Sequence, residues 1–392
     1  MLDQLTIKGF KSIREVVGLN LGSINVLVGG NGAGKSNLIE FFKMLRAMQG
    51  FRLAEFGAYK PSLSRFLENK GGLQNFLFGG TQITQEIQAT LKFNFGKNGY
   101  RFVIGLTADA SYSIIDEAFC YCSDLKGAES WYSPGTKGDF RKESCLSECL
   151  EQAQAGKRTT RYQYIYNTIR AWQIYQFHDT SQFAAARLPS FVYDCDELHF
   201  DGGNLAAFLY SLKNGRVDVG EAQCQESYVQ IVDMIRLIAP YFKDFVLEPF
   251  KEGDEEKIRL QWLQNDMLMK FQPHHISDGT LRFMCLATVL LQPRPPELII
   301  IDEPELGLHP EALEVLAELI HRCSSRTQFI LATQSPSFAD FFNPEEILTV
   351  NRINGASVFE RQSQERLGKW LESYSIGQLW RKNVIKGGVS NG

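Results

Sequence analysis

The feature that most constrains the fold of this 392-residue chain is the segment GGNGAGKS at residues 29–36. It matches the pattern G-x-x-x-x-G-K-[ST], and the preceding SINVLVG reads as a strand that enters the loop. The following KSNLIEFFKML reads as a helix that leaves the loop. A glycine-rich turn at a helix N-terminus directs backbone N–H groups toward one point, where they can hold an anion. The segment therefore predicts a loop that binds the phosphates of a nucleoside triphosphate.

The chemistry of this loop assigns an expected role to each residue. Glycine permits the backbone conformations that point successive N–H groups the same way. Lys35 is expected to bridge the β- and γ-phosphates, and the Ser36 hydroxyl is expected to be a Mg²⁺ ligand. ATP and Mg²⁺ are therefore the expected cofactors. The expected nucleotide-binding residues of the loop are Gly29, Gly30, Asn31, Gly32, Ala33, Gly34, Lys35, Ser36 and Asn37.

A second informative segment, ELIIIDE, lies far along the chain at residues 297–303. Its apolar run reads as a buried strand, and it ends in the adjacent carboxylates Asp302 and Glu303. Proteins with a phosphate loop hold Mg²⁺ and a catalytic base at such a position. The segment therefore predicts the acidic part of the same nucleotide site.

A third segment, HHISDGTLRFMCLATVLL, precedes the acidic strand. Ser277, Asp278, Gly279 and Thr280 open a helix there, and a serine hydroxyl at a helix N-terminus makes a second surface for an anion. Taken by itself, S-D-G-T is an ordinary helix cap. Its place between the phosphate loop and the acidic strand favours the anion-binding interpretation.

The phosphate loop and the acidic strand lie far apart in sequence, so we expect the lobe that contains them to be built from discontinuous segments of the chain. The segment ITQEIQATLKFNF alternates, Gly96–Gly99 turns and YRFVIGL returns, which predicts antiparallel strands. A polar insertion is expected at 120–160. A helix is expected at 222–240, with an apolar stripe from Val229 to Ile238. Short strands are expected within 243–271, the last of them at MLMKFQ. The expected domains are 1–82, the N-terminal part of the ATPase lobe; 83–119, an antiparallel β subdomain; 120–290, an inserted helical and β lobe that ends in the Ser277 helix; and 291–392, the C-terminal part of the ATPase lobe.

Composition and charge limit which partners and which cellular compartment we expect. The formal net charge is −4 and the pI is near 6.0, so a nucleic-acid partner has no support from a basic footprint. No run of eighteen apolar residues exists, which argues against a membrane span. The N-terminus lacks a secretory signal and the eight cysteines are scattered, so we expect reduced thiols and a cytoplasmic location.

Taken together, the motifs resemble the ABC-type ATPases of the RecF and SMC group, particularly the bacterial AAA-family ATPases that consist of a headpiece only. The matching segments are GFKSI at 9–13, GGNGAGKS, ISDGTLR at 276–282, ELIIIDEPELGLHP and ILATQSP at 330–336. The resemblance implies an α/β fold, an ABC-type P-loop ATPase head with an antiparallel β subdomain and a helical signature lobe. It also implies a homodimer in which Ser277 and Gly279 of one copy contact the nucleotide of the other.

The resemblance assigns roles to residues outside the phosphate loop. Asp302 would hold Mg²⁺ through its shell, and Glu303 would polarise the attacking water. Gln74, in GGLQNF, is a candidate Mg²⁺-sensing residue, although an ordinary surface glutamine fits the same sequence equally well. Most ABC ATPases have a histidine where this chain has Gln334, and an amide cannot titrate. We therefore expect Gln334 to support slow hydrolysis that awaits a partner.

Two functional interpretations remain open at this stage. The segment between the motifs shows no heptads, which argues against the coiled-coil arm of SMC proteins, and little chain follows Asp302 in which to place a nuclease domain. The preferred interpretation is an ATP-driven dimer switch that controls a separately encoded effector, such as a nuclease or toxin, in antiviral defence or DNA maintenance. The alternative is a RecF-like, ATP-dependent DNA clamp. A transporter subunit is disfavoured because the middle of the chain is too long.

Overall fold

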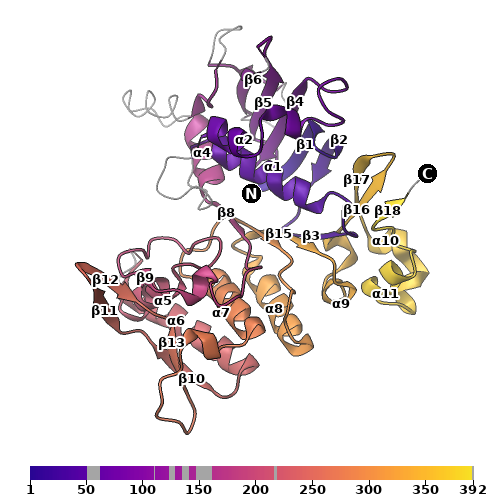
Figure 1. The fold of residues 1–392 in the computed structure, drawn as a ribbon. Coiled ribbons are helices and arrows are strands. Elements are labelled where there is room, and N and C mark those ends of the chain that lie inside the picture. Colours follow the sequence, from indigo (N-terminus) through magenta and orange to yellow (C-terminus); the bar gives the residue numbers. More distant parts are fainter. Residues whose placement is uncertain are drawn as a thin grey trace. The chain divides into compact units, whose positions relative to one another are not determined.

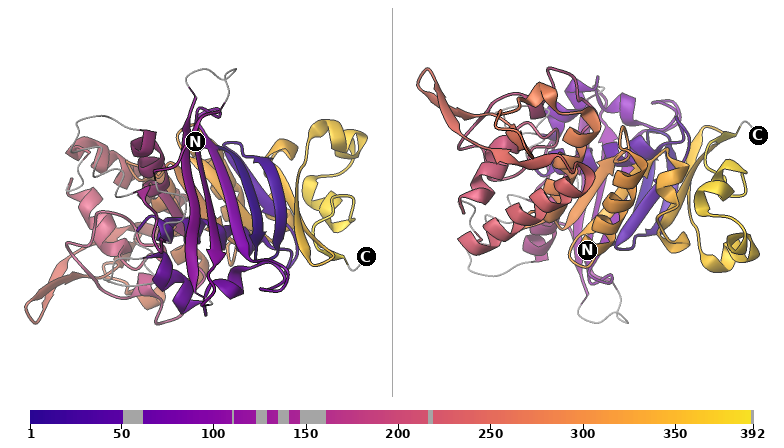
Figure 2. Two further views of the ribbon diagram at one scale, coloured as in Figure 1. Left: turned by 90° about the horizontal axis from the view of Figure 1, so that it is seen from above. Right: turned by 90° about the horizontal axis from the view of Figure 1, so that it is seen from below.

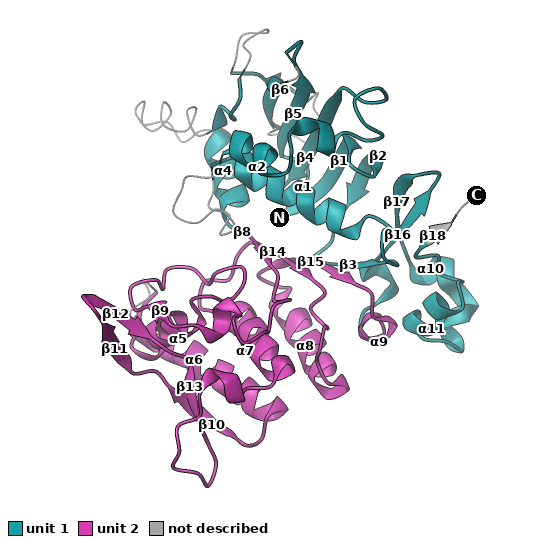
Figure 3. Cartoon of the chain, in the orientation of Figure 1, with its two compact units in different colours: residues 1–172, 342–392 teal, residues 173–341 magenta. Residues whose placement is uncertain are grey.

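The computed structural model describes residues 1–50, 62–109, 111–122, 129–134, 141–146, 161–215 and 219–390. The chain forms two compact units, which Figure 3 distinguishes by colour. Unit 1 contains Met1–Trp172 and Phe342–Gly392, and unit 2 contains Gln173–Phe341. Unit 1 therefore combines residues from both ends of the sequence. Most of the polar insertion expected at 120–160 lies outside the described residues.

An antiparallel sheet with the strand order β2-β1-β4-β5-β6-β7 is the largest element of unit 1, and its strands run side by side in the left view of Figure 2. Its strands are β1 (Leu2–Phe10), β2 (Ile13–Asn20), β4 (Glu86–Phe93), β5 (Asn98–Leu106), β6 (Tyr112–Tyr121) and β7 (Trp131–Tyr132). The antiparallel pair expected across Gly96–Gly99 is present as β4 and β5. The N-terminal strands β1 and β2 belong to the same sheet.

Helix α1 (Lys35–Met48), which leaves the phosphate loop, packs on apolar side chains of this sheet. Alternation in β4 directs every second residue inward, and Ile87 and Phe93 are buried. Phe41 of α1 lies edge-on to Phe10, with 5.6 Å between ring centroids, and stacks on Phe102 at 6.3 Å. Burial of a phenylalanine contributes about 1.5–3 kcal/mol. These contacts fix the helix that follows the loop.

The strand that enters the loop, β3 (Ile24–Val28), is buried along its whole length and pairs in parallel with β16 (Ile347–Ile353). β16 also pairs with β17 (Ala356–Arg361) in an antiparallel hairpin and with β18 (Val389–Ser390) in parallel. The remaining helices of unit 1 are α2 (Leu63–Asn69), η2 (Leu73–Phe76), α4 (Arg161–Arg170), η5 (Pro344–Glu346), α10 (Gln364–Leu367), η6 (Gly368–Glu372) and α11 (Ile376–Arg381). Figure 1 shows the C-terminal elements in yellow beside β16.

Unit 2 contains the acidic strand β14 (Leu298–Asp302), which pairs in parallel with β15 (Gln328–Thr333). Helix α7 (Asp278–Leu291) begins at the Ser277 segment and packs on α6 (Glu221–Ile238) and α8 (Pro310–Cys323). The other elements are β8 (Trp172–Tyr175), which begins on the last residue of unit 1, η3 (Ala185–Arg187), β9 (Ser190–Phe191), α5 (Leu205–Lys213), β10 (Phe242–Val246), β11 (Pro249–Glu252), β12 (Glu255–Ile258), β13 (Gln261–Gln264), η4 (Pro273–His275) and α9 (Pro336–Ala339).

Two local predictions for unit 2 are wrong in detail. MLMKFQ follows the turn at Asn265 and Asp266, where Asp266 has φ +62°, as irregular chain rather than a strand; only its Phe271 forms an isolated bridge, to Trp262. Val229 is 54% exposed, whereas Val232 and Ile235 are buried. Residues spaced by three drift around a helix with 3.6 residues per turn, so a stripe with that spacing does not stay on one face.

Two further expectations concern the helices: that the chain lacks a coiled-coil arm and that it lacks a membrane span. The longest is α6, with 18 residues, so the part of the chain that the structure describes contains no coiled-coil arm. None of the described helices is both long enough and apolar enough to cross a membrane.

A chain of buried hydrogen bonds shapes the phosphate loop from behind. Asn37 Nδ2 donates to Ser12 Oγ over 2.6 Å, and Ser357 Oγ donates to the carbonyl of Ala33 over 2.6 Å. The two serine oxygens are 2.6 Å apart. Because the Ser357 proton is used on Ala33, Ser12 must be the donor between the serines. The chain thus joins the first turn of α1 to the loop through the β17 hairpin.

The same hydroxyls occupy the space beside Gly34. A Cβ at this position would lie 2.0 Å from Ser357 Oγ and 2.8 Å from Ser12 Oγ, and the residue has φ +114°. L-amino acids rarely adopt that backbone conformation. Glycine is therefore required at residue 34 for steric and conformational reasons together.

We expect Gly34→Ala to weaken ATP binding by more than about tenfold, because relief of the clash must move either the loop or the serines behind it. Gly30→Ala is the matched control in the same loop, since its Cβ would lie 3.6 Å from Gly388 Cα in ordinary contact. Calorimetric titration with ATP measures both variants. Equal affinities for Gly34→Ala and the parent protein would contradict the steric argument.

Candidate nucleotide site

The phosphate loop presents its backbone and leaves its tip accessible. Asn31 and Gly32 are exposed, and Gly32 has φ +76°. Lys35 is the first residue of α1 and is largely buried, and its Nζ donates to the carbonyls of Gly29 (2.5 Å) and Gly30 (3.2 Å). Ser36 follows in the first turn and is exposed. The arrangement joins a glycine-rich cradle, a helix N-terminus and an ammonium group, which together suit a phosphate chain.

The C-terminal segment of unit 1 contacts this loop directly. Gly30 N–H donates to the carbonyl of Gly387 over 3.3 Å, and the indole N–H of Trp380 donates to the same carbonyl over 3.1 Å. Gly388 N–H donates to Asn351 Oδ1 on β16. The edge of the loop is therefore held by a segment that the sequence motifs did not indicate.

Gln74, the candidate Mg²⁺-sensing residue, lies in η2 of unit 1. It is exposed, and its Nε2 donates to the carbonyl of Gly71 over 2.6 Å. This bond closes a local turn and holds the side chain close to its own backbone. The role of Gln74 toward Mg²⁺ stays a prediction.

The ends of β14 and β15 bring Glu303 and Gln334 together in unit 2. Gln334 Nε2 donates to Glu303 Oε1, and the backbone N–H of Glu303 donates to the carbonyl of Ala332 over 2.8 Å. Glu303 has φ +50°, which is rare for a residue with a side chain. Such strain is maintained where the surroundings fix the backbone, and it often marks a functional position. Asp302, one residue earlier, is buried, and its carbonyl is 3.1 Å from His178 Nε2.

Glu305, which lies in the matching segment ELIIIDEPELGLHP, is a structural carboxylate at the same strand ends. Its Oε1 accepts from Thr333 Oγ1 (2.6 Å) and from the backbone N–H of Gln334 (3.1 Å). Burial of the carboxyl, opposed by these bonds and assisted by the nearby Glu303, raises the pKa of Glu305 above its usual value. The carboxyl joins the turn after β14 to the end of β15.

The Ser277 segment forms the N-terminus of α7. Ser277 is exposed; its Oγ accepts from Thr280 N–H over 3.2 Å and lies 2.7 Å from Thr280 Oγ1. A Cβ on Gly279 would lie 2.4 Å from the carbonyl of Gly307, so only glycine permits this close approach. The helix start is thus packed against the turn that follows the acidic strand.

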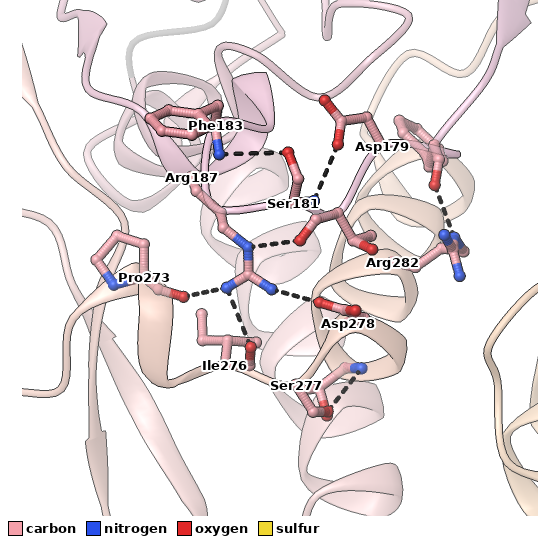
Figure 4. Close-up of polar contacts among 12 residues, drawn as sticks. Asp179, Ser181, Phe183, Arg187, Pro273, Ile276, Ser277, Asp278 and Arg282 are labelled. Carbon is pink, nitrogen blue, oxygen red and sulfur yellow. Dashed lines mark hydrogen bonds and ion pairs between the residues drawn. The ribbon is translucent and has the colours of Figure 1, made fainter.

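Two arginines tie the loops of unit 2 together, as Figure 4 shows. Arg282 donates to the carbonyls of Phe177 (2.7 Å), His178 (3.2 Å) and Leu306. Arg187 donates to three carbonyls and pairs with Asp278 at 2.8 Å. Sequence reasoning assigned no role to His178 or Arg187, because no local pattern indicates their distant partners.

The structure therefore groups the expected residues by unit. Unit 1 contains the phosphate loop and Gln74, whereas unit 2 contains Asp302, Glu303, Gln334, Ser277 and Gly279. Among the described residues, no group of three or more histidine, cysteine or acidic side chains is arranged to hold a metal ion by itself.

We expect Glu305→Gln to change how stability depends on pH. A carboxyl whose pKa is raised in the folded state binds more protons there than in the unfolded chain. The free energy of unfolding therefore falls as pH rises from about 4.5, the ordinary value, through the folded pKa. Glutamine does not titrate, so it removes this loss. The free energy of unfolding of the variant, relative to that of the parent, should therefore rise from pH 4.5 to pH 8. Urea unfolding across this range tests it, and parallel curves would contradict it.

The comparison with protein families identifies the class of this chain. Residues 24–134 and 209–340 match the family described as "AAA domain, putative AbiEii toxin, Type IV TA system". The match covers more than half of the chain. It includes the phosphate loop, the Ser277 segment and both strand ends, whereas His178 and Arg187 lie between the two matched segments.

Curated relatives match shorter parts of the chain. A putative ABC transporter ATP-binding protein of Bacillus cereus is 28% identical over 139 residues, which is 35% of this chain and 24% of that protein. The energy-coupling factor transporter ATP-binding protein EcfA2 of Geobacillus kaustophilus is 32% identical over 100 residues, which is 25% of this chain and 33% of that protein. The chain thus spans about a quarter to a third of the length of these relatives.

Solved structures match over nearly the whole chain. An Smc head bound to the C-terminal winged-helix domain of ScpA gives a TM-score of 0.52 at 16% identity, over 93% of this chain and 99% of that one. The Smc head of Pyrococcus furiosus with an extended coiled coil gives 0.50 at 15% identity, over 95% and 98%. At these identities the likeness concerns the fold. The chain belongs to the AAA-domain family described as putative AbiEii toxin of a type IV system, and its α/β fold is that of an ABC-type, RecF/SMC-like ATPase head.

Proposed function

We propose that the protein binds and hydrolyses ATP at composite sites between two copies of the chain, and that this cycle switches a separately encoded effector. The observation that carries the proposal is the shaped phosphate loop. It has Gly32 and Gly34 at positive φ, followed directly by a helix whose first residue is Lys35. Membership of an ATPase family supports the same activity.

The loop residues from Gly29 to Asn37 would receive the triphosphate. The Lys35 ammonium, which binds the carbonyls of Gly29 and Gly30, would exchange them for β- and γ-phosphate oxygens. Ser36 and Asp302, with Gln74 as a further candidate, would hold Mg²⁺, which neutralises charge on the phosphates when bound. These assignments follow from the family pattern.

Glu303 would act as the base that orients water, and Gln334 would hold its carboxylate. The hydrogen bond between the two side chains supports this division of roles. An amide can donate a hydrogen bond to the Glu303 carboxylate, but it cannot supply a proton as a histidine can. We therefore propose that hydrolysis is slow until a partner completes the site.

Ser277 and Gly279 would contact the γ-phosphate of ATP that is bound to a second copy of the chain. The support is that Ser277 is exposed at the N-terminus of a 14-residue helix, where backbone N–H groups and a hydroxyl suit an anion. Two-fold symmetry would give two such sites in a homodimer.

A separate effector protein is the partner we propose. The family description names a type IV toxin–antitoxin system, which supports a task in bacterial defence. A solved Smc head of this fold is bound to a domain of another protein, ScpA, which illustrates a head that carries a separately encoded partner. ATPase stimulation by DNA with steep salt dependence would instead favour the DNA clamp.

We expect Glu303→Gln to bind ATP without hydrolysing it and so to accumulate as a dimer. Ser277→Arg in that background should return it to monomer, because a bulky cation then occupies the interface, while each copy still binds ATP. Light scattering with ATP and Mg²⁺ measures the mass. Lys35→Ala in the same background is the control, and it should lose both ATP binding and the dimer.

A mass that responds neither to ATP nor to Ser277→Arg would overturn the composite site. If the protein is already a dimer without ATP, crosslinking between cysteines introduced beside Ser277 replaces the mass as the readout. ATP-independent crosslinking there would overturn the site equally.

We expect Gln334→His to change the rate of ATP turnover while ATP affinity stays within about twofold, because the residue contacts Glu303 rather than the phosphate loop. Gln230→His, on the exposed face of α6, is the matched control and should alter neither quantity. A Gln334→His protein with the turnover of the parent, with and without a partner protein, would show that this position does not tune the reaction.

A further inference from the structure

The segment proposed to receive a γ-phosphate contains a carboxylate at a sensitive position. Asp278 follows Ser277 directly, and its side chain is 64% exposed. A carboxylate in the first turn of a helix interacts favourably with the positive helix end. The same charge would repel a phosphate group that approaches Ser277. The proposed function therefore requires something to offset the charge of Asp278.

Arg187 lies directly behind this carboxylate. Its Nη2 is 2.8 Å from Asp278 Oδ1, and its side chain is only 6% exposed. The pair thus has an outward-facing anion and a buried cation. Arg282 also feels the charge of Asp278, but its nitrogens are committed to backbone carbonyls. Among the described residues, Arg187 is the cation in ion-pair contact with Asp278.

The same guanidinium fixes the backbone on both sides of the helix start. Nη1 donates to the carbonyls of Pro273 and Ile276, the latter over 3.0 Å, and Nε donates to the carbonyl of Thr180 over 3.1 Å. Figure 4 shows the fork reaching across to the turn before Ser277. Lysine has no planar fork and cannot make this set of bonds. Arg187 therefore determines both where Ser277 lies and how negative its surroundings are.

We propose that Arg187 is a positioning residue for the composite ATP site. It fixes the turn that carries Ser277 and masks the charge of Asp278, so that the γ-phosphate on a second copy can bind there. This proposal rests on the proposed function and adds a residue outside the segments matched by the family. Arg187 acts through Ser277 and Asp278, and it would not contact the nucleotide of its own chain.

The test measures the dimer dissociation constant by sedimentation in ATP and Mg²⁺, with Glu303→Gln as the parent. Arg187→Met should weaken the dimer by at least about tenfold, because an unmasked carboxylate then faces the phosphate. ATP affinity of the monomer should stay within about twofold, since the phosphate loop is unaffected. Arg236→Met is the matched control, because it removes an exposed pair with Asp233 on α6 and should leave the dimer unchanged.

Asp278→Asn separates charge masking from a purely structural role. Alone, it should tighten the dimer by about threefold or more, because Arg187 then adds an uncompensated positive charge. Combined with Arg187→Met, it should recover most of the lost affinity, which the loss of carbonyl contacts by itself would not permit. The single Asp278→Asn variant keeps Arg187 and therefore tests the charge even if Arg187→Met does not fold.

Three results would overturn the proposal. They are an Arg187→Met dimer as tight as that of the parent, a double variant whose dimer is no tighter than that of Arg187→Met, and an Asp278→Asn dimer no tighter than that of the parent. Each would remove the role of Arg187 while the ATP-dependent dimer of the parent stands. A Glu303→Gln parent that stays monomeric in ATP would instead overturn the composite site, and the role of Arg187 with it.

Discussion

The architecture around the nucleotide site depends on a backbone loop that must be held open without a side chain at residue 34. The Ser357 hydroxyl fills the space where that side chain would lie and binds the carbonyl of Ala33, 324 residues away in sequence. Ser12 extends the contact to Asn37 at the start of α1. Unit 1 must therefore assemble from both ends of the chain before the loop has its shape, because Ser12 lies in the turn between β1 and β2 and Ser357 lies in β17.

In unit 2, hydrogen bonds from buried side chains to backbone carbonyls hold irregular loops in place. Its loops are irregular, so their carbonyl groups find no partners in helices or sheets and need donors from side chains. Arg282 and Arg187 supply several donors each from buried positions, and Glu305 accepts from the end of β15. The strained backbone of Glu303 is held within this framework. Buried polar side chains thus replace secondary structure at the places where the proposed chemistry needs exposed loops.

Two residues that contact the expected nucleotide-site segments lie outside the ranges matched by the family. The matched segments contain the phosphate loop, the Ser277 segment and the acidic strand. His178 and Arg187 lie between those segments, yet they contact Asp302 and Asp278 within them. Residues of the intervening segment therefore contact the motifs within the matched segments directly.

The sequence by itself determined the phosphate loop, the acidic strand, the helix start at Ser277 and the antiparallel pair β4 and β5, because each depends on neighbours in sequence. It misjudged the strand at MLMKFQ, after the turn at Asp266, and the exposure of Val229, where sheet partners and helix phase decide. Only the tertiary structure revealed Ser357 behind Gly34, the contact of Gln334 with Glu303, and Arg187 behind Asp278. A serine or arginine has no local pattern that names a distant partner, so its role is fixed only when folding buries it beside an unsatisfied carbonyl or charge.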